Sequence, residues 1–207
     1  MRRPERLIPV VGVGLVATTA LAAVALAGTS APALGVVPAY DRAAFGPAWQ
    51  DTDRNGCDQR NDVLARDLTE VVRTGFCTVV SGQLSDPYSD LTVSFVRQGG
   101  YQPVQIDHVR ALKDAWNHGA YAWSAGKRLA YATDERNLLP TTLNSTKGDS
   151  EPAELAAAET RVGNKWRPSA AGECRYAATY VLTSARWELP VDSDDAAALA
   201  ETLQRCP

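Results

Sequence analysis

The sequence lacks the short motifs that mark the most common catalytic classes. It has no G-x-S-x-G nucleophile elbow, no G-x-x-x-x-G-K-[ST] phosphate-binding loop and no H-E-x-x-H zinc motif. Internal repeats, collagen-like glycine spacing and sustained heptads are also absent, which excludes the repeat and fibrous classes. Histidine is scarce, since the 207 residues include only His108 and His118. Catalysis that depends on an imidazole therefore has two candidate residues.

An excess of positive charge is missing as well. The chain has 21 Lys and Arg against 24 Asp and Glu, a formal net charge of −3. Because neutralising DNA phosphates takes many Lys and Arg contacts, this balance argues against tight, sequence-specific binding to duplex DNA. With 45% hydrophobic and 22% charged residues, the chain is typical of a globular protein, and one folded domain is expected.

The N-terminus has the pattern of an export signal. Three arginines among the first six residues precede an uncharged run over 7–27, and small residues would suit cleavage after residue 27 or 33. The run is also long enough to remain as a membrane anchor. We therefore predict a secreted protein, or a membrane-anchored one if the signal is not cleaved. The predicted organisation is a signal peptide over 1–33, a linker rich in Pro, Ala and Gly over 34–47, and a folded domain over 48–207.

Cysteine is limited to four residues, and none belongs to a C-x-x-C pair. The predicted export and the even number of cysteines favour disulfides over a zinc site. Three pairings are open. We favour Cys57–Cys77 with Cys174–Cys206, because each of these disulfides closes a short loop around neighbouring elements.

Hydrophobic patterning predicts an α+β fold with a small sheet. Apolar residues over 63–72 fall at helical spacing. Alternation over 91–106 predicts a β-hairpin that ends at Asp107-His108. Further along, we expect short helices over 110–117 and 127–132, a short strand over 137–140 and a helix from Asn144. Two C-terminal helices should follow. The first carries Tyr176, Tyr180, Val181 and Trp187 on one face, and the second is capped by Ser193.

An ordered set of polar residues follows the predicted hairpin. Asp107-His108 comes first, then Asn137-Leu138-Leu139, then Asn144 and Lys147. This set resembles the ββα-metal motif of HNH endonucleases in its Asp-His…Asn…Asn variant. The chain is also similar to secreted bacterial proteins of the HNH family, of this length and with four cysteines, at Gly56-Cys57-Asp58, Arg60-Asn61-Asp62, Asp86-Pro87-Tyr88, Ala115-Trp116, Lys147-Gly148-Asp149 and Trp166-x-Pro168.

The resemblance implies a nuclease that uses one divalent cation, Mg²⁺ first and Mn²⁺ as the alternative. Asp107 and Asn144 would supply the hard oxygen ligands that such ions prefer. His108 would act as the general base, because a neutral imidazole can take the proton of an attacking water. Asn137 would brace the segment that carries His108. Lys147, three residues after Asn144, would reach a substrate phosphate or the developing negative charge.

Two geometric expectations accompany this interpretation. Adjacent residues of a regular strand point to opposite faces, so a bend or bulge at Asp107-His108 is expected if both serve one site. Arg60 and Arg110 are candidate substrate contacts, although an ion pair of Arg60 with Asp58 or Asp62 is an equal alternative. A local basic groove is hypothesised from Arg110, Lys113, Lys127, Arg128, Arg136, Lys147 and Lys165.

A second metal site is suggested upstream. Asp51-x-Asp53-x-Asn55-Gly56, with Asp62 at the twelfth place, fits the calcium-loop pattern except that Asp replaces the usual Glu. A structural Ca²⁺ there and a disulfide-anchored turn without metal both remain open.

We therefore predict a secreted, metal-dependent endonuclease that hydrolyses DNA with low sequence specificity. Two alternatives remain: a non-catalytic, calcium-stabilised binding module, and a nuclease or phosphodiesterase that acts on RNA. The sequence indicates no protein partner, and no stable membrane span once the signal is cleaved.

Overall fold

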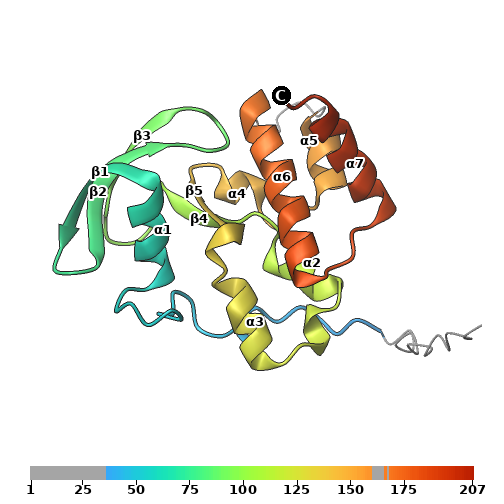
Figure 1. The fold of residues 1–207 in the computed structure, drawn as a ribbon, viewed down its shortest axis with the longest axis horizontal. Helices are drawn as coiled ribbons and strands as arrows, with labels where there is room; N and C mark the ends of the chain where they lie inside the picture. Colours follow the sequence, from blue (N-terminus) through green and yellow to red (C-terminus); the bar gives the residue numbers. More distant parts are fainter. Residues whose placement is uncertain (1–35, 160–165, 167) are drawn as a thin grey trace, which may run out of the picture. The chain divides into compact units, whose positions relative to one another are not determined.

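The structure is a computed structural model, and it describes residues 36–159, 166 and 168–207 (Figure 1). Within this part, Val37–Pro207 forms one compact unit. The predicted signal over 1–33 lies outside the described residues, as does Lys165 of the hypothesised groove. Among the helices that are described, none is both long and apolar enough to cross a membrane.

The first part of this unit is a helix followed by a three-stranded sheet. α1 spans Gln59–Asp67, and β1 (Leu68–Thr74), β2 (Thr78–Ser85) and β3 (Thr92–Val96) form an antiparallel sheet in the order β1-β2-β3. The prediction of one helix through residue 72 is therefore wrong in its second half. The segment after α1 is rich in β-branched residues, and it gains cross-strand partners in β2 that a helix could not offer.

The second sheet is a two-stranded ribbon that carries the Asp-His pair. β4 (Gln105–His108) runs antiparallel to β5 (Leu138–Thr141), with Asp107 opposite Leu139 and His108 opposite Leu138. The predicted hairpin over 91–106 does not form, because β3 pairs with β2. Alternation identifies a strand without naming its partner, and neighbouring strands in sequence pair only about two-thirds of the time. The strand predicted over 137–140 is confirmed as β5.

The other elements are short helices and two longer C-terminal ones. They are η1 (Arg42–Phe45), α2 (Leu112–Asn117), η2 (Ala120–Ala122), α3 (Ala125–Ala132), η3 (Glu135–Asn137), α4 (Asn144–Lys147), α5 (Pro152–Glu159), α6 (Ala170–Trp187) and α7 (Ser193–Gln204). The helices predicted in the second half of the chain are confirmed, although α7 is capped at Asp192 and not at Ser193. This mixed architecture confirms the predicted α+β class, whereas the ββα-metal core stays a prediction.

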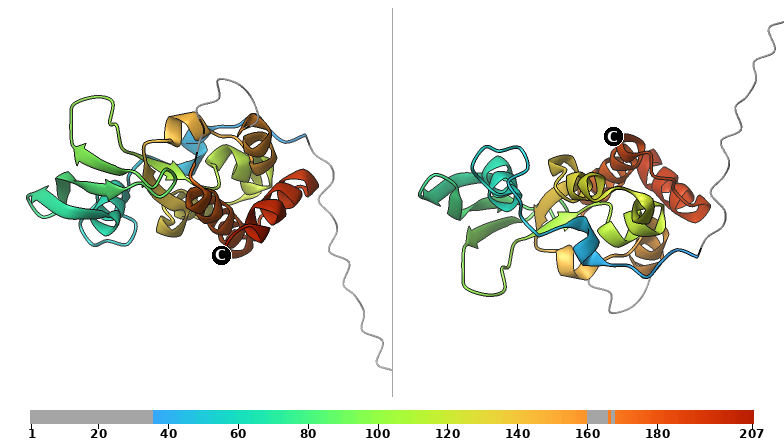
Figure 2. Two further views of the ribbon diagram at one scale, coloured as in Figure 1. Left: turned by 90° about the horizontal axis from the view of Figure 1, so that it is seen from above. Right: turned by 90° about the horizontal axis from the view of Figure 1, so that it is seen from below.

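The β4–β5 ribbon lies between two hydrophobic cores. Figures 1 and 2 show it between the three-stranded sheet and helices α6 and α7. Ile106 and Leu138 belong to the core beneath that sheet, whereas Leu139 belongs to the core of the C-terminal helices. Because successive strand residues face opposite sides, a ribbon buried on both faces fixes the position of Asp107 and His108 from both sides.

A third core forms around α2 and α3, and it includes residues that were predicted to be a linker. Phe45 of η1 is fully buried among the aromatic side chains of this core. Trp116 Nε1 donates a hydrogen bond to the carbonyl oxygen of Pro38 at 2.8 Å. Residues 37–47 of the linker predicted over 34–47 are therefore part of the folded unit.

Both favoured disulfides are confirmed, namely Cys57–Cys77 and Cys174–Cys206. The first joins the segment before α1 to the turn between β1 and β2. The second joins the first half of α6 to the end of the chain after α7.

Candidate active site

A cavity of about 270 Å³ lies where the end of β4 meets α4, η1 and the start of α2. Asp107, His108 and Asn144, which the sequence analysis assigned to one site, all line it. The remaining lining residues are Tyr40, Arg42, Ile106, Ala111, Leu112, Ser145, Gly148 and Asp149. The ribbon and the helix after it therefore bring the predicted base and the two predicted metal ligands to one cavity.

His108 is the last residue of β4, and its ring orientation is fixed by the end of α3. The ring Nε2 lies 2.9 Å from the carbonyl oxygen of Ala132. A carbonyl oxygen can only accept, so Nε2 carries the hydrogen and Nδ1 of the neutral ring keeps its lone pair. Burial, together with the charges of Arg42 and Lys147, lowers the pKa of His108 to about 4, against the raising effects of the Ala132 hydrogen bond and of Asp107. The ring is therefore neutral near pH 7, with Nδ1 as its proton acceptor.

Asp107 is 1% exposed, and both of its carboxylate oxygens have partners. Oδ1 accepts a hydrogen bond from Lys147 Nζ at 3.0 Å, and Oδ2 accepts one from the Tyr88 hydroxyl at 2.7 Å. Burial, followed by the charge of Asp107, raises the pKa of Tyr88 well above its usual value, so the phenol remains a donor. A carboxylate has about four lone-pair sites, so this pair of donors leaves room for a further cation.

α4 is a single turn, and two residues separate it from β5. Asn144 donates from Nδ2 to Gln105 Oε1 at 2.8 Å, and within the described part of the chain its Oδ1 has no hydrogen-bond partner. Lys147 is 1% exposed, and its Nζ donates to Asp107 Oδ1 and, at 3.1 Å, to the carbonyl oxygen of His108. The prediction that Lys147 reaches a substrate phosphate is corrected, because its ammonium group is buried against Asp107.

Asn137 occupies the position that the resemblance assigns to a brace. Its Nδ2 donates to the carbonyl oxygen of Arg110 at 2.9 Å, and its Oδ1 accepts from the Arg110 amide at 2.8 Å. The Val109 amide donates to the Asn137 carbonyl oxygen at 2.9 Å. Asn137 therefore holds the backbone directly after His108, which fixes where β4 ends.

The expected bulge at Asp107-His108 is absent. The pairing of β4 with β5 is regular over all four residues. His108 ends the strand and still lines the same cavity as Asp107. A regular strand is therefore compatible with one shared site when the second residue lies at the end of the strand.

Arg110 does not have the role in substrate binding that the sequence predicts. It is fully buried, and its guanidinium donates to Asp114, to Ser184 Oγ and to the carbonyl oxygens of Leu189 and Pro190. A substrate at the surface cannot reach it, so Arg110 is a structural residue that joins α2 to the end of α6.

Three residues of the hypothesised basic groove have partners within the protein. Arg110 and Lys147 are buried, and Arg128 donates to backbone carbonyl oxygens that include that of Ala44. Lys113, Lys127 and Arg136 are exposed.

Arg60 is half-buried, with its guanidinium over the Trp49 ring and a hydrogen bond to the Val104 carbonyl oxygen at 3.1 Å. The ion pair of Arg60 with Asp58 or Asp62 does not form, and its contact with substrate stays a prediction.

The loop over 51–62 is held by its own polar side chains. Asn55 donates from Nδ2 to Asp53 and Asp62, and Asp51 accepts from the Gly56 amide at 3.0 Å. Asp53 and Asp62 lie close to Glu135 of η3, a carboxylate that the sequence pattern could not identify. Asp51 is not part of that group, so the arrangement differs from the predicted loop, and calcium binding there stays a prediction.

Arg42 is a site residue that the sequence analysis missed. It lies in η1, is exposed, and lines the cavity that holds His108. The run Tyr40-Asp41-Arg42 supplies the only charged residues of the predicted linker, and this was the available signal. An exposed guanidinium at such a cavity is suited to contact a phosphate.

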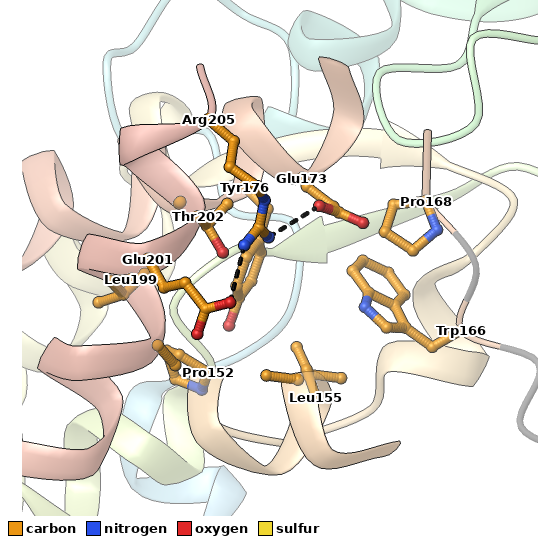
Figure 3. A pocket seen from close by; sticks show the side chains of 13 residues that line it. Pro152, Leu155, Trp166, Pro168, Glu173, Tyr176, Leu199, Glu201, Thr202 and Arg205 are labelled. Atoms are coloured by element: carbon orange, nitrogen blue, oxygen red, sulfur yellow. Dashed lines mark hydrogen bonds and ion pairs between the residues drawn. The ribbon is translucent and has the colours of Figure 1, made fainter. Parts of the chain in front are cut away.

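A second cavity, of about 380 Å³, lies among α5, α6 and α7 (Figure 3). Arg205 forms ion pairs there with Glu173 and Glu201, at 3.5 and 3.0 Å. The hydroxyl of Tyr176 is buried without a hydrogen-bond partner. None of the predicted catalytic residues lines this cavity.

Comparison with curated proteins found a secreted relative. The chain is 31% identical over 186 residues to an uncharacterized secreted protein of Arthroderma benhamiae, and the match covers 87% of this chain and 82% of the fungal protein. No family model matches the chain. No solved structure matches it.

Proposed function

The chain belongs to the same family as the secreted protein of Arthroderma benhamiae and is itself secreted, and we propose that it is an extracellular, metal-dependent endonuclease that hydrolyses phosphodiester bonds of DNA. The proposed site is a ββα-metal core made of β4, β5 and α4. His108 is the general base, and Asp107 and Asn144 hold the cation.

One observation carries this proposal. His108, whose ring is oriented by a hydrogen bond, lines the same cavity as the oxygen ligands of Asp107 and Asn144. The hydrogen bond from Nε2 to Ala132 selects the tautomer in which Nδ1 accepts a proton. Nδ1 can then remove the proton from a water that attacks phosphorus. Asn137 supports this role, since its hydrogen bonds to the backbone after His108 limit how far the ring can shift.

The donor set suits a hard divalent cation. Asp107 offers carboxylate oxygens with unused lone pairs, and Asn144 offers an amide oxygen that has no partner among the described residues. When bound, the cation would stabilise negative charge on the phosphate and the leaving oxygen. Lys147 holds Oδ1 of the Asp107 carboxylate and the Tyr88 hydroxyl holds Oδ2, so the carboxylate keeps its position.

The charge distribution favours a substrate that is read through its phosphates with little sequence selection. The chain carries a net charge of −3, and two of the cations near the motif are buried. Arg42 remains exposed at the cavity and is the proposed phosphate contact. Few phosphate contacts give weak, non-specific binding, which suits an extracellular nuclease that meets DNA of any sequence.

Plasmid nicking by the secreted chain tests the proposal. The wild type should cleave with Mg²⁺ or Mn²⁺ and lose activity in EDTA. His108→Gln should lower the rate at least about 100-fold, because a general base contributes about 10²–10⁴ in rate. Glutamine can still donate to Ala132, so near-UV circular dichroism should show an intact fold.

Arg73→Gln is the matched control, since it removes an exposed charge on β1 that neither belongs to the hypothesised groove nor lines the cavity. Equal cleavage by wild type and His108→Gln would overturn the assignment of the base. If no metal supports cleavage of DNA or RNA, the proposed nuclease activity is overturned. A strong preference for RNA would retain the site and change the substrate.

A further inference from the structure

Asp86 is a buried carboxylate that the proposed reaction does not use. It directly follows β2, is 1% exposed, and belongs to the Asp86-Pro87-Tyr88 segment that contributes to the resemblance. Its two oxygens bind two segments that are far apart in the sequence. One segment is the turn that carries Tyr88, and the other is the connection between β5 and α4.

The first of these segments leads to Asp107. Asp86 Oδ1 accepts hydrogen bonds from the amide of Tyr88 at 3.0 Å and from the amide of Ser89 at 3.4 Å. The side chain of Tyr88 in turn donates from its hydroxyl to Asp107 Oδ2 at 2.7 Å. Asp86 therefore fixes the backbone of the residue whose hydroxyl holds a proposed metal ligand.

The second segment leads to Asn144. Asp86 Oδ2 accepts from the amide of Thr142 at 2.7 Å and from the hydroxyl of the same residue at 2.8 Å. The Thr141 hydroxyl donates to the same carboxylate, at 3.0 and 3.2 Å from its two oxygens, and accepts from the Leu143 amide at 3.0 Å. Leu143 is the N-cap of α4 and forms no side-chain cap. The bonds to Asp86 therefore fix where α4 begins, and with it Asn144.

Within the described part of the chain, the donors to the Asp86 carboxylate are all uncharged. A buried charge is costly unless it is well hydrogen-bonded, and hydrogen bonds to an ionised group are roughly twice as strong as neutral ones. An ionised carboxylate only accepts, so every donor must point toward it. One buried charge therefore joins both segments at a single point, which an apolar side chain of the same size could not do.

We propose that Asp86 is a positioning residue of the proposed cation site, an inference that rests on the proposed function. Through Tyr88 it positions Asp107 of β4, and through Thr142 it positions Asn144 of α4. It thereby fixes the separation of two oxygen ligands that come from different elements. Asp86 does not line the candidate active-site cavity, so it acts through these residues and not on the cation. Removal of a group that orients metal ligands typically lowers metal affinity or activity by about 10–100-fold.

Binding of Mn²⁺ to the secreted chain, freed of metal beforehand, tests the inference without an assay of cleavage. The electron paramagnetic resonance signal of free Mn²⁺ measures the binding, and the part that Asp107→Asn abolishes belongs to the proposed site. Asp86→Asn should weaken that part by about 10–100-fold, because an amide offers one acceptor oxygen where the carboxylate offers two. The Mg²⁺ concentration that gives half-maximal plasmid nicking should rise by a similar factor.

Thr142 offers a milder pair of variants at the same contact. Thr142→Val keeps the shape of the side chain and removes the hydroxyl that donates to Asp86 Oδ2, so it should weaken the same part of Mn²⁺ binding by at least about 3-fold. Thr142→Ser keeps this donor and should bind Mn²⁺ as the wild type does. The pair tests the inference even if Asp86→Asn does not fold.

Tyr180→Phe is the stability control, because it removes a buried hydroxyl donor outside the site and should leave Mn²⁺ binding unchanged. Equal weakening by Tyr180→Phe and Asp86→Asn would overturn the inference, as would wild-type binding in both Asp86→Asn and Thr142→Val. The expected binding pattern without cleavage of any nucleic acid would support Asp86 as a positioning residue and overturn only the nuclease. If the wild type has no Mn²⁺ binding that depends on Asp107, both proposals are overturned.

Discussion

At the residue scale, the buried carboxylate of Asp107 depends on its two donors. Lys147 balances its charge at 3.0 Å, and the Tyr88 hydroxyl holds the other oxygen at 2.7 Å. A buried charge that loses a partner is costly, because the interior offers no water in its place. The two residues therefore fix the carboxylate that the proposed function requires, although neither was assigned this task from the sequence.

Tyr88→Phe should destabilise the protein by about 1–3 kcal/mol, because Asp107 Oδ2 is left buried without a donor. Cleavage should fall as well, since the carboxylate is free to shift. Urea unfolding gives the first value and plasmid nicking the second. Tyr180→Phe removes an equally buried hydroxyl that donates to Asp114 at 2.7 Å, and so should cost similar stability without loss of cleavage. Equal losses of cleavage in both variants would contradict a specific role for Tyr88.

At the element scale, α6 approaches the turn before β3 with no space between the backbones. A Cβ on Gly172 would lie 2.0 Å from the carbonyl oxygen of Tyr88 and 2.6 Å from its carbonyl carbon. The Ser169 amide also donates to that oxygen at 2.7 Å. The first turn of α6 therefore positions Tyr88, and through it Asp107.

Gly172→Ala should destabilise the protein by about 1–3 kcal/mol, because backbone atoms cannot move aside as a flexible side chain would. Gly126→Ala is the matched control, since Gly126 lies in the first turn of α3 with no atom within 4 Å of its Cβ position. That variant should be neutral or more stable by about 0.4–1 kcal/mol. Thermal unfolding of the pair measures the difference, and equal stability would show that the close approach relaxes freely.

At the scale of the whole molecule, the two disulfides lie on opposite sides of the β4–β5 ribbon in the sequence. Cys57–Cys77 closes 20 residues around α1 and β1, and Cys174–Cys206 closes 32 residues around α6 and α7. Neither cysteine pair lines the candidate active-site cavity. We therefore expect the two disulfides to contribute to the free energy of unfolding and not to catalysis.

Replacement of Cys174 and Cys206 by serine should cost about 3 kcal/mol, because the unfolded chain regains the freedom that the closed loop removes. Metal-dependent cleavage per folded molecule should be unchanged. Guanidinium unfolding and plasmid nicking below the transition check the two statements. A loss of cleavage in the fully folded variant would show that the C-terminal helices act on the site directly.

The sequence by itself determined the mixed fold class and the order of Asp107, His108 and Asn144, which line the cavity. Among three open cysteine pairings, it favoured the one that forms. These follow from local patterns, since periodicity, cysteine spacing and an ordered Asp-His and Asn set are visible along the chain. Only the tertiary structure decided the strand partners, the burial of Arg110 and Lys147, the place of Arg42 beside His108 and the hydrogen bonds between Asp86 and Thr142. Each of these depends on contacts between distant segments, and no local pattern encodes which buried surface will cover a given charge.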